Sequence, residues 1–321
     1  MVRWLATILV LHCMCGPVWS DETLPGRLVP PKGVPRMQVI PLPRSEVSIQ
    51  DDGRELTRHI YDSSLRRPFL YPLLGPSGRS LTRMGHPRDP NGHSHHNSVW
   101  ISHNMVDGVD FWGDAGHGRI VQRTITQFGD ADEEALVQSE NEWLGAGDKV
   151  LLKELRTMRV QPLEGKTWLL VIDLELAPPA GEVTLGKTPF GFIGVRMAKT
   201  IGVHDGGGTI RNSAGGVNEK EVFWKPAKWV DYSGPIARDT VEGITLMDHP
   251  GNPNHPAKFH VRDDGWMGAS ATFDAARTIR AGEPLKLRYG LWIHAGAPPA
   301  ALIEQHHVAF AKIGDPPAKK K

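Results

Sequence analysis

Cysteine is almost absent from this sequence of 321 residues, which contains two cysteines, Cys13 and Cys15. Both lie in residues 1–20, where Arg3 precedes an apolar run and a small residue, Ser20, ends the segment. This order predicts a secretory signal peptide that is cleaved after Ser20. The mature chain would then have no cysteine, which excludes a disulfide framework, a thiolate nucleophile and a cysteine-ligated metal. We therefore expect a secreted or periplasmic protein.

The sequence also lacks an excess of charge of either sign. It has 37 lysines and arginines against 36 aspartates and glutamates, so binding to nucleic acid through a basic surface is not expected. The one basic run, residues 319–321, belongs to a predicted basic tail over residues 314–321 and is best explained as a solvated terminus. A spanning helix needs about 20 apolar residues, so no membrane span is expected in the mature chain.

What the sequence does contain is short segments of alternating apolar and polar residues, rich in β-branched side chains. They predict strands over residues 47–50, 55–61, 98–103, 120–127, 134–143, 149–160, 167–176, 191–198 and 285–295, with one convincing helix over residues 299–312. Closely spaced strands without alternating helices predict an all-β fold, a large antiparallel β-sandwich with a short C-terminal helix. We expect a proline-rich, extended lead-in over residues 21–46 and a single sandwich domain over residues 47–313.

Histidine is concentrated in residues 85–112, where five of the fifteen histidines fall within eighteen residues. These are His86, His93, His95, His96 and His103. Such a cluster has three interpretations: ligands for zinc or another transition metal, an acid and a base near neutral pH, or polar loop residues with ordinary hydrogen bonds. The pattern lacks the H-E-x-x-H signature of zinc hydrolases, and on its own it leaves all three open.

The backbone conformation decides which of these histidines lie together. On the strand predicted to end at His103, side chains alternate, so His103 lies on the face opposite Trp100. If the extended conformation continues upstream, His93 and His95 share one face and His96 lies opposite them. A helical turn would instead pair His93 with His96. Proline and glycine just upstream favour a loop that leads into the strand.

The same stretch resembles the signature of a bacterial family labelled methane oxygenase PmoA, usually treated as a domain of unknown function. The family pattern reads roughly D-H-P-H-H-R-G-L-W-F-A and then N-G-V-D-F-W, and the sequence matches it at His93, His95, His96, Trp100, Gly108, Asp110, Phe111 and Trp112. At Gly92 and Asn97, where the family has aspartate and arginine, two charged groups that could orient the histidines are missing, and Asp107 replaces an asparagine. Similarity in residues 67–83, 229–234, 243–256 and 259–266 extends the resemblance from about residue 47 to about residue 296.

Proteins of this family are in turn remotely similar to the galactose-mutarotase-like β-supersandwich of sugar epimerases, glycosidases and polysaccharide lyases. The resemblance implies a sugar held on an open, concave sheet face, with histidine and carboxylate groups exchanging protons at the reacting carbon. Because fold does not fix function, this substrate class is an analogy.

The leading hypothesis is a secreted carbohydrate-active protein that performs acid/base chemistry on a sugar or glycoside, as an epimerase, lyase or hydrolase. In it His96 and His103 are the acid and the base, and Asp248 or His249 is a partner from across the sheet, unless these two only form a turn. The predicted substrate-binding residues are Arg83, Trp112, Arg196, Tyr232, His260 and Trp266. Arg196 could instead pair with an aspartate, and His260 could be a buried, hydrogen-bonded histidine.

Two further hypotheses come from different classes. One is a metal-dependent hydrolase or oxidase, in which His93 and His95, with a distant histidine or aspartate, hold a divalent metal. The other is a non-catalytic glycan-binding module, for which the aromatic residues would matter and the histidines would not.

Overall fold

The computed structural model describes residues 33–85, 88 and 93–318. The predicted signal peptide, residues 21–32 of the lead-in, His86 and the last three lysines lie outside the described residues. The β-sandwich belongs to the compact unit that begins at Pro35.

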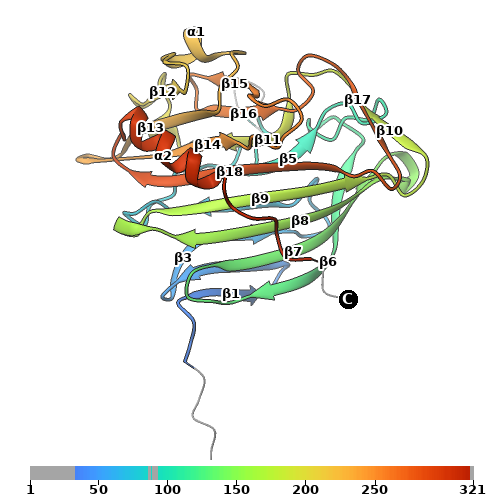
Figure 1. The fold of residues 1–321 in the computed structure, drawn as a ribbon, viewed down its shortest axis with the longest axis horizontal. Helices are drawn as coiled ribbons and strands as arrows, with labels where there is room; N and C mark the ends of the chain where they lie inside the picture. Colours follow the sequence, from blue (N-terminus) through green and yellow to red (C-terminus); the bar gives the residue numbers. More distant parts are fainter. Residues whose placement is uncertain (1–32, 86–87, 89–92, 319–321) are drawn as a thin grey trace, which may run out of the picture. The chain divides into compact units, whose positions relative to one another are not determined.

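Two antiparallel eight-stranded sheets make up this unit (Figure 1). The first sheet has the order β1 (Met37–Leu42), β2 (Glu46–Asp51), β3 (Arg54–Ile60), β4 (Phe69–Leu73), β5 (Val99–His103), β11 (Gly191–Arg196), β16 (Trp266–Ser270) and β15 (Lys258–Arg262). The second sheet has the order β12 (Thr209–Asn212), β13 (Trp229–Ala237), β14 (Thr240–Asp248), β18 (Leu285–Ala295), β9 (Trp168–Ala177), β8 (Val150–Pro162), β7 (Ala135–Leu144) and β6 (Arg119–Gly129). The predicted antiparallel β-sandwich is confirmed.

Smaller elements join the two sheets. A two-stranded ribbon pairs β10 (Glu182–Leu185) with β17 (Arg277–Arg280). Single 3-10 turns are η1 (Ala146–Asp148), η2 (Glu164–Lys166) and η3 (Lys199–Ile201), and the helices are α1 (Asn218–Val222) and α2 (Ala300–Phe310). Within the described ranges, no helix has the length and apolar character needed to cross a membrane.

Alternation along the strands explains where the core lies. In β18, Leu285, Leu287, Leu291 and Ile293 point into the main core, while Trp292 belongs to a second apolar cluster. Every second side chain faces the main core, as strand geometry requires, and the side chains between them, including Arg288, Trp292 and His294, are buried on the other face. This alternation is the reason that the strand predicted over residues 285–295 matches β18 in full.

The second apolar cluster lies under α2, which Figure 1 shows beside β14 and β18. Ile303 and Phe310 of the helix are fully buried against Trp229, Met247 and Trp292 of the second sheet. This cluster covers the face of the sheet opposite the main core, so the short C-terminal helix completes the packing of the fold.

The first sheet begins earlier in the chain than residue 47. β1 lies within the proline-rich segment, pairs with β2 from Met37 to Leu42, and buries Met37 and Val39. Prolines fit here because β1 is an edge strand, where one row of backbone N–H groups needs no ladder partner. The proline content therefore hides a strand that extends the sheet.

Candidate functional site

A pocket of about 340 Å³ lies over β5, β16 and β15 of the first sheet. Trp100 of β5 and Trp266 of β16 lie beside it, on the face opposite the one that carries Val99 and Ile101. The pocket is lined by His93, His95, His96, Asn104, Asp110, Trp112, Gly113, Phe190, His260, Arg262 and Trp266. Six of the predicted metal-binding, catalytic and substrate-binding residues are thus brought together: His93, His95, His96, Trp112, His260 and Trp266.

Two glycines allow large rings to lie flat against the sheet here. A Cβ on Gly194 would come within 2.4 Å of the Trp100 ring, and one on Gly268 within 2.3 Å of the Trp266 ring. Both contacts are far closer than atoms tolerate, so the strands need glycine beneath the indoles. The backbone of β11 and β16 is therefore adapted to an aromatic floor.

That floor is a cluster of indoles and imidazoles. Trp112 lies 5.1 Å from Trp100 and 5.8 Å from Trp266, measured between ring centroids. His96 stacks on Trp100 at 5.0 Å, and His260 stacks on Trp266 at 4.9 Å. Trp112 and Trp266 border the pocket, although only 4% and 2% of their surfaces are exposed, while Trp100 lies beneath His96 and does not line it. Apolar rings beside polar ring atoms suit a ligand that is itself amphipathic, with C–H groups and hydroxyls.

The histidine segment forms a turn before β5. The His96 N–H donates to the His93 carbonyl at 3.1 Å, and the rings of these two residues stack with centroids 4.5 Å apart. His95 meets His96 edge-on at 4.6 Å. The extended arrangement that groups His93 with His95 opposite His96 is therefore wrong, because a backbone hydrogen bond closes the chain and pairs His93 with His96.

Arg67 fixes this turn against the segment that carries Trp112. Its guanidinium donates to the carbonyl oxygens of His95, Phe111 and Trp112 and to Oδ1 of Asn97, at 2.6–3.0 Å. The side chain is 1% exposed, and burial lowers its pKa to about 10. A guanidinium has five donors in a rigid fork and can bond all four of these acceptors at once, whereas a lysine ammonium has three donors. Arg67 thus joins the two halves of the histidine and tryptophan signature.

A partly buried ion pair contacts His93. Nη1 of Arg196 lies 2.8 Å from Oδ1 of Asp264, and Nδ1 of His93 lies 3.0 Å from Oδ2 of the same carboxylate. Burial would raise the pKa of Asp264, but hydrogen bonds from His93 and Arg196 outweigh it and hold that pKa well below its usual range. Arg196, suggested as a substrate clamp or as an aspartate partner, is the partner of Asp264.

Burial disfavours the protonated form of His95, His96 and His260 by lowering the pKa of each ring. Burial lowers the pKa of His96 far below its usual range, and the nearby guanidinium groups of Arg196 and Arg83 lower it further; burial lowers the pKa of His260 to about 4. Burial and then the charge of Arg67 also lower the pKa of His95. Nδ1 of His96 and Nδ1 of His260 are buried without a hydrogen-bond partner among the residues that the structure describes. A buried nitrogen without a hydrogen-bond partner costs folding free energy, so binding of a ligand that supplies the missing hydrogen bond is favoured.

His103 lies on the opposite face of β5, as alternation predicts, and is fully buried. Its Nδ1 accepts from the Met105 N–H at 3.1 Å, so Nε2 carries the ring proton and donates to Oγ1 of Thr272 at 2.8 Å. Burial lowers its pKa to about 4. With both nitrogens in use inside the protein, His103 serves the structure rather than the pocket.

Tyr232 and Arg83 do not line the pocket. The Tyr232 hydroxyl accepts from the Val203 N–H and lies within hydrogen-bonding distance of the carbonyls of Arg262 and Asp263, at 3.2 and 3.1 Å. It therefore supports the β15–β16 turn that carries the aspartates. The Arg83 N–H donates to the Arg196 carbonyl at 3.0 Å, next to β11.

Asp248 and His249 belong to the second sheet. Asp248 accepts from Asn252 at 2.7 Å, from Nδ1 of His255 at 2.8 Å and from the Ala257 N–H at 2.9 Å, so it organises the turn that follows β14. His249 lines a different cavity of about 540 Å³, which shares no residue with the histidine and tryptophan pocket. The structure does not bring these two residues to His96.

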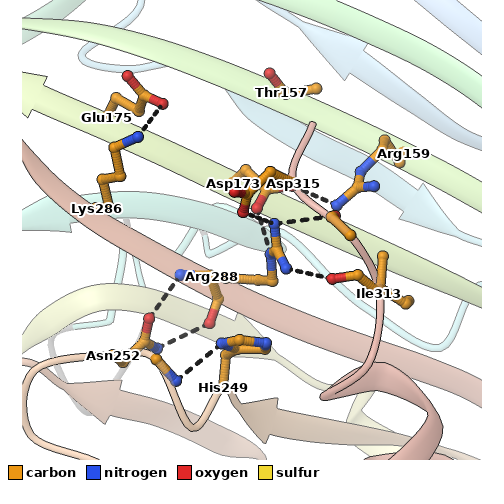
Figure 2. A network of polar contacts seen from close by, with 12 residues as sticks. Thr157, Arg159, Asp173, Glu175, His249, Asn252, Lys286, Arg288, Ile313 and Asp315 are labelled. Carbon is orange, nitrogen blue, oxygen red and sulfur yellow. Dashed lines mark hydrogen bonds and ion pairs between the residues drawn. The ribbon is translucent and has the colours of Figure 1, made fainter. Parts of the chain in front are cut away.

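Arg288 lines this second cavity and is the centre of a network of polar contacts (Figure 2). It pairs with Asp173 and donates to the carbonyls of Ile313 and Gly314, so the segment after α2 runs across the sheet here. Asn252 accepts from the Arg288 N–H at 2.7 Å, and Arg159 pairs with the same Asp173. The guanidinium of Arg288 is thus occupied by the protein's own chain.

A metal centre on His93 and His95 would need further ligands. In the part of the chain that the structure describes, no group of three or more histidine, cysteine, aspartate or glutamate side chains is placed to hold a metal ion.

The fold and the pocket define a β-sandwich protein with a histidine and tryptophan site on its first sheet. A model of a family of unknown function, DUF6807, matches residues 46–308, and the chain belongs to this family. The matching description contains no activity, so the methane oxygenase label stays a resemblance. No functionally curated protein is significantly similar to the chain.

Two solved structures are similar in outline. One is a heparinase III with methylated lysines, with 12% identity and a TM-score of 0.35, matched over 84% of this chain and 37% of that protein. The other is a candidate kojibiose phosphorylase from the human microbiome, with 8% identity and a TM-score of 0.33, matched over 87% of this chain and 36% of that protein. The chain thus spans little more than a third of either protein, and similarity this low carries no argument about its function.

Arg67 and Asp264 hold the site in place, yet the sequence alone does not single them out. Asp264 sits in the turn Asp263–Asp264–Gly265, where acidic residues and glycine are the ordinary composition of a β-turn. Arg67 precedes a proline in a loop. Both roles depend on partners far away in the sequence, which no local pattern reveals.

Proposed function

We propose that the histidine and tryptophan pocket binds a carbohydrate and performs acid/base chemistry on it. The observation that carries the proposal is the combination of stacked indoles with His93, whose imidazole is held by the partly buried Asp264–Arg196 pair. Indole faces stack on the C–H faces of sugar rings, and neutral imidazoles accept hydrogen bonds from hydroxyls. A pocket of this volume accommodates one or two sugar rings.

In this proposal His93 moves the proton. Because Nδ1 faces Asp264, proton exchange with the sugar takes place at Nε2, and the carboxylate stabilises the imidazolium that forms. Arg196 keeps Asp264 ionised and in position. His96 and His260, which burial holds neutral, accept hydrogen bonds from the sugar hydroxyls and orient the ring.

The test combines binding and turnover on glycans. Purified protein is screened against ladders of malto-, cello-, xylo- and galacturono-oligosaccharides, with binding followed by calorimetry and products by NMR. We expect Trp266→Ala to abolish binding, and His93→Gln and Asp264→Asn to lower kcat about a hundredfold or more while binding persists. His204→Ala, an exposed histidine outside the pocket, is the matched control and should behave as wild type.

The outcomes separate the hypotheses. Normal kcat in a folded His93→Gln variant would contradict the acid/base role. Binding without any turnover would instead indicate the glycan-binding module, and absence of binding by wild type would contradict the proposal as a whole.

We also propose that the protein acts outside the cytoplasm. The support is the order of basic residue, apolar run and small residue in residues 1–20. Expression of the full chain in a bacterial host tests this, because export predicts a mature N-terminus at Asp21 by mass spectrometry, whereas an uncleaved protein in the cytoplasm would contradict it.

A further inference from the structure

Outside the pocket, one tryptophan is both exposed and held in an unfavourable backbone conformation. Trp224 follows α1, and 44% of its surface is exposed. Its φ is +59°, in the left-handed region that bulky residues avoid. Backbone strain of this kind persists where the surroundings impose it, and it is concentrated at binding sites.

The surroundings of Trp224 do impose its position. Its N–H donates to the Phe259 carbonyl at 2.8 Å, and the Phe259 N–H donates back to the Lys225 carbonyl at 3.3 Å. One turn earlier, the Glu219 N–H donates to Oδ1 of Asp263 at 3.0 Å, and the Asp263 N–H donates to the Glu219 carboxylate at 2.9 Å. α1 and Trp224 are thus fastened to β15 and to the β15–β16 turn, so the indole is presented by a fixed segment.

A row of rings connects Trp224 with the pocket. Phe223 stacks on Trp224 with centroids 4.4 Å apart and meets His260 edge-on at 4.9 Å. His260 stacks in turn on Trp266 of the pocket floor. On the other side Phe273 lies 5.6 Å from Trp224. The aromatic surface therefore continues from the pocket out to an exposed indole.

Cationic side chains accompany this row. Lys258 and Arg262 flank the neutral His260 on the edge strand β15, so all three share one face. Lys258 pairs with Asp274 and Arg262 pairs with Glu219. The Arg262 guanidinium lies 4.9 Å from the Phe223 ring, and the Lys258 ammonium lies 4.6 Å from the Phe273 ring. N–H donors beside aromatic faces are the pairing that recognises hydroxyl groups and ring faces together.

We infer that Trp224 is a stacking platform for a further sugar ring of a chain whose end lies in the pocket, so that the ligand is an oligosaccharide rather than a monosaccharide. This inference rests on the proposed carbohydrate function of the pocket. The bound chain would run from Trp266 past His260 to Trp224, along the face of β15.

The test measures how affinity depends on chain length. Wild type, Trp224→Ala and Trp266→Ala are titrated with each member of the oligosaccharide ladder that wild type binds, from the monosaccharide upward. Phe128→Ala, an aromatic residue of β6 that is 43% exposed, serves as the matched control. We expect Trp224→Ala to lose about tenfold in affinity for the longer members and nothing for the monosaccharide, whereas Trp266→Ala loses affinity for all.

Two results would overturn the inference in distinguishable ways. If Trp224→Ala matches Phe128→Ala for every chain length while Trp266→Ala is impaired, the Trp224 platform is contradicted and the pocket stands. If wild type binds no oligosaccharide of any ladder, the proposed function fails and the platform fails with it. Unchanged melting temperatures in all variants establish that the comparison concerns binding.

Discussion

Arg67 shows how much of the pocket depends on a single side chain. It is buried, it has no aspartate or glutamate as a hydrogen-bonding partner among the contacts described, and its partners are three carbonyls and an amide oxygen. The guanidinium therefore supplies hydrogen bonds to loop carbonyls that have few alternatives inside the protein. The positions of His95 and Trp112 both follow from it.

At this scale we expect Arg67→Met to destabilise the protein by about 3 kcal/mol or more, because several buried acceptors lose their donor together. The measurement is the free energy of unfolding in urea. Arg123→Ala provides the control, since Arg123 pairs with Glu142 at the surface and such pairs contribute at most about 1 kcal/mol. Equal losses in the two variants would contradict the role given to Arg67.

Single residues also show how far the sequence could predict the site. Histidine density and the two tryptophans mark the right region, because His93, His96, Trp112 and Trp266 all line one pocket. His103 belongs to the same histidine-rich stretch of sequence, yet its side chain lies on the face of β5 opposite the pocket. Residue type shows which chemistry is available, but only the backbone decides which side chains meet.

At the scale of the elements, substitutions in α2 test whether the second apolar cluster stabilises the sandwich. We expect Phe310→Ala to cost about 3 to 5 kcal/mol of unfolding free energy, because it leaves a cavity against Met247 and Trp292. Val308→Ala on the same helix removes a side chain that is 44% exposed and should cost less than about 1 kcal/mol. Chemical denaturation of the two variants gives the comparison. A cost below 1 kcal/mol for Phe310→Ala would show that the helix is only loosely attached.

Elements differ in how well alternation predicts them. The long strands β8 and β18 are predicted closely, although both of their faces are largely buried and not one face alone. β1 is not predicted because the prolines around it interrupt the two-residue alternation of apolar and polar residues. Proline is nevertheless acceptable in β1, since this strand lies at the edge of the sheet. The turn at His93 escapes it because a single backbone hydrogen bond, not a periodic pattern, closes it.

Across the whole molecule, buried histidines couple stability to pH. Burial lowers the pKa of His59, His103 and His260 to about 4, and that of His96 further. In the unfolded chain a histidine side chain has a pKa of about 6.5 and binds a proton below that pH, whereas in the folded protein these histidines stay unprotonated down to a lower pH. Their contribution is therefore fully present above pH 6.5 and is lost as the pH falls towards 4.

We accordingly expect the free energy of unfolding to fall by several kcal/mol between pH 7.5 and pH 5, with about 2 kcal/mol from each histidine whose pKa is lowered to about 4. Urea denaturation at both pH values measures it, and His103→Gln should weaken the pH dependence by about one such share. Stability that is constant over this range would contradict the neutral, buried state of these side chains.

The most direct measurement for the molecule as a whole is a crystal structure with the best-binding oligosaccharide from the ladders. We predict a sugar ring against Trp112 and Trp266, within hydrogen-bonding distance of His93 and His96. A sugar bound instead beside His249 and Arg288 on the second sheet, with the histidine and tryptophan pocket empty, would contradict the proposed site.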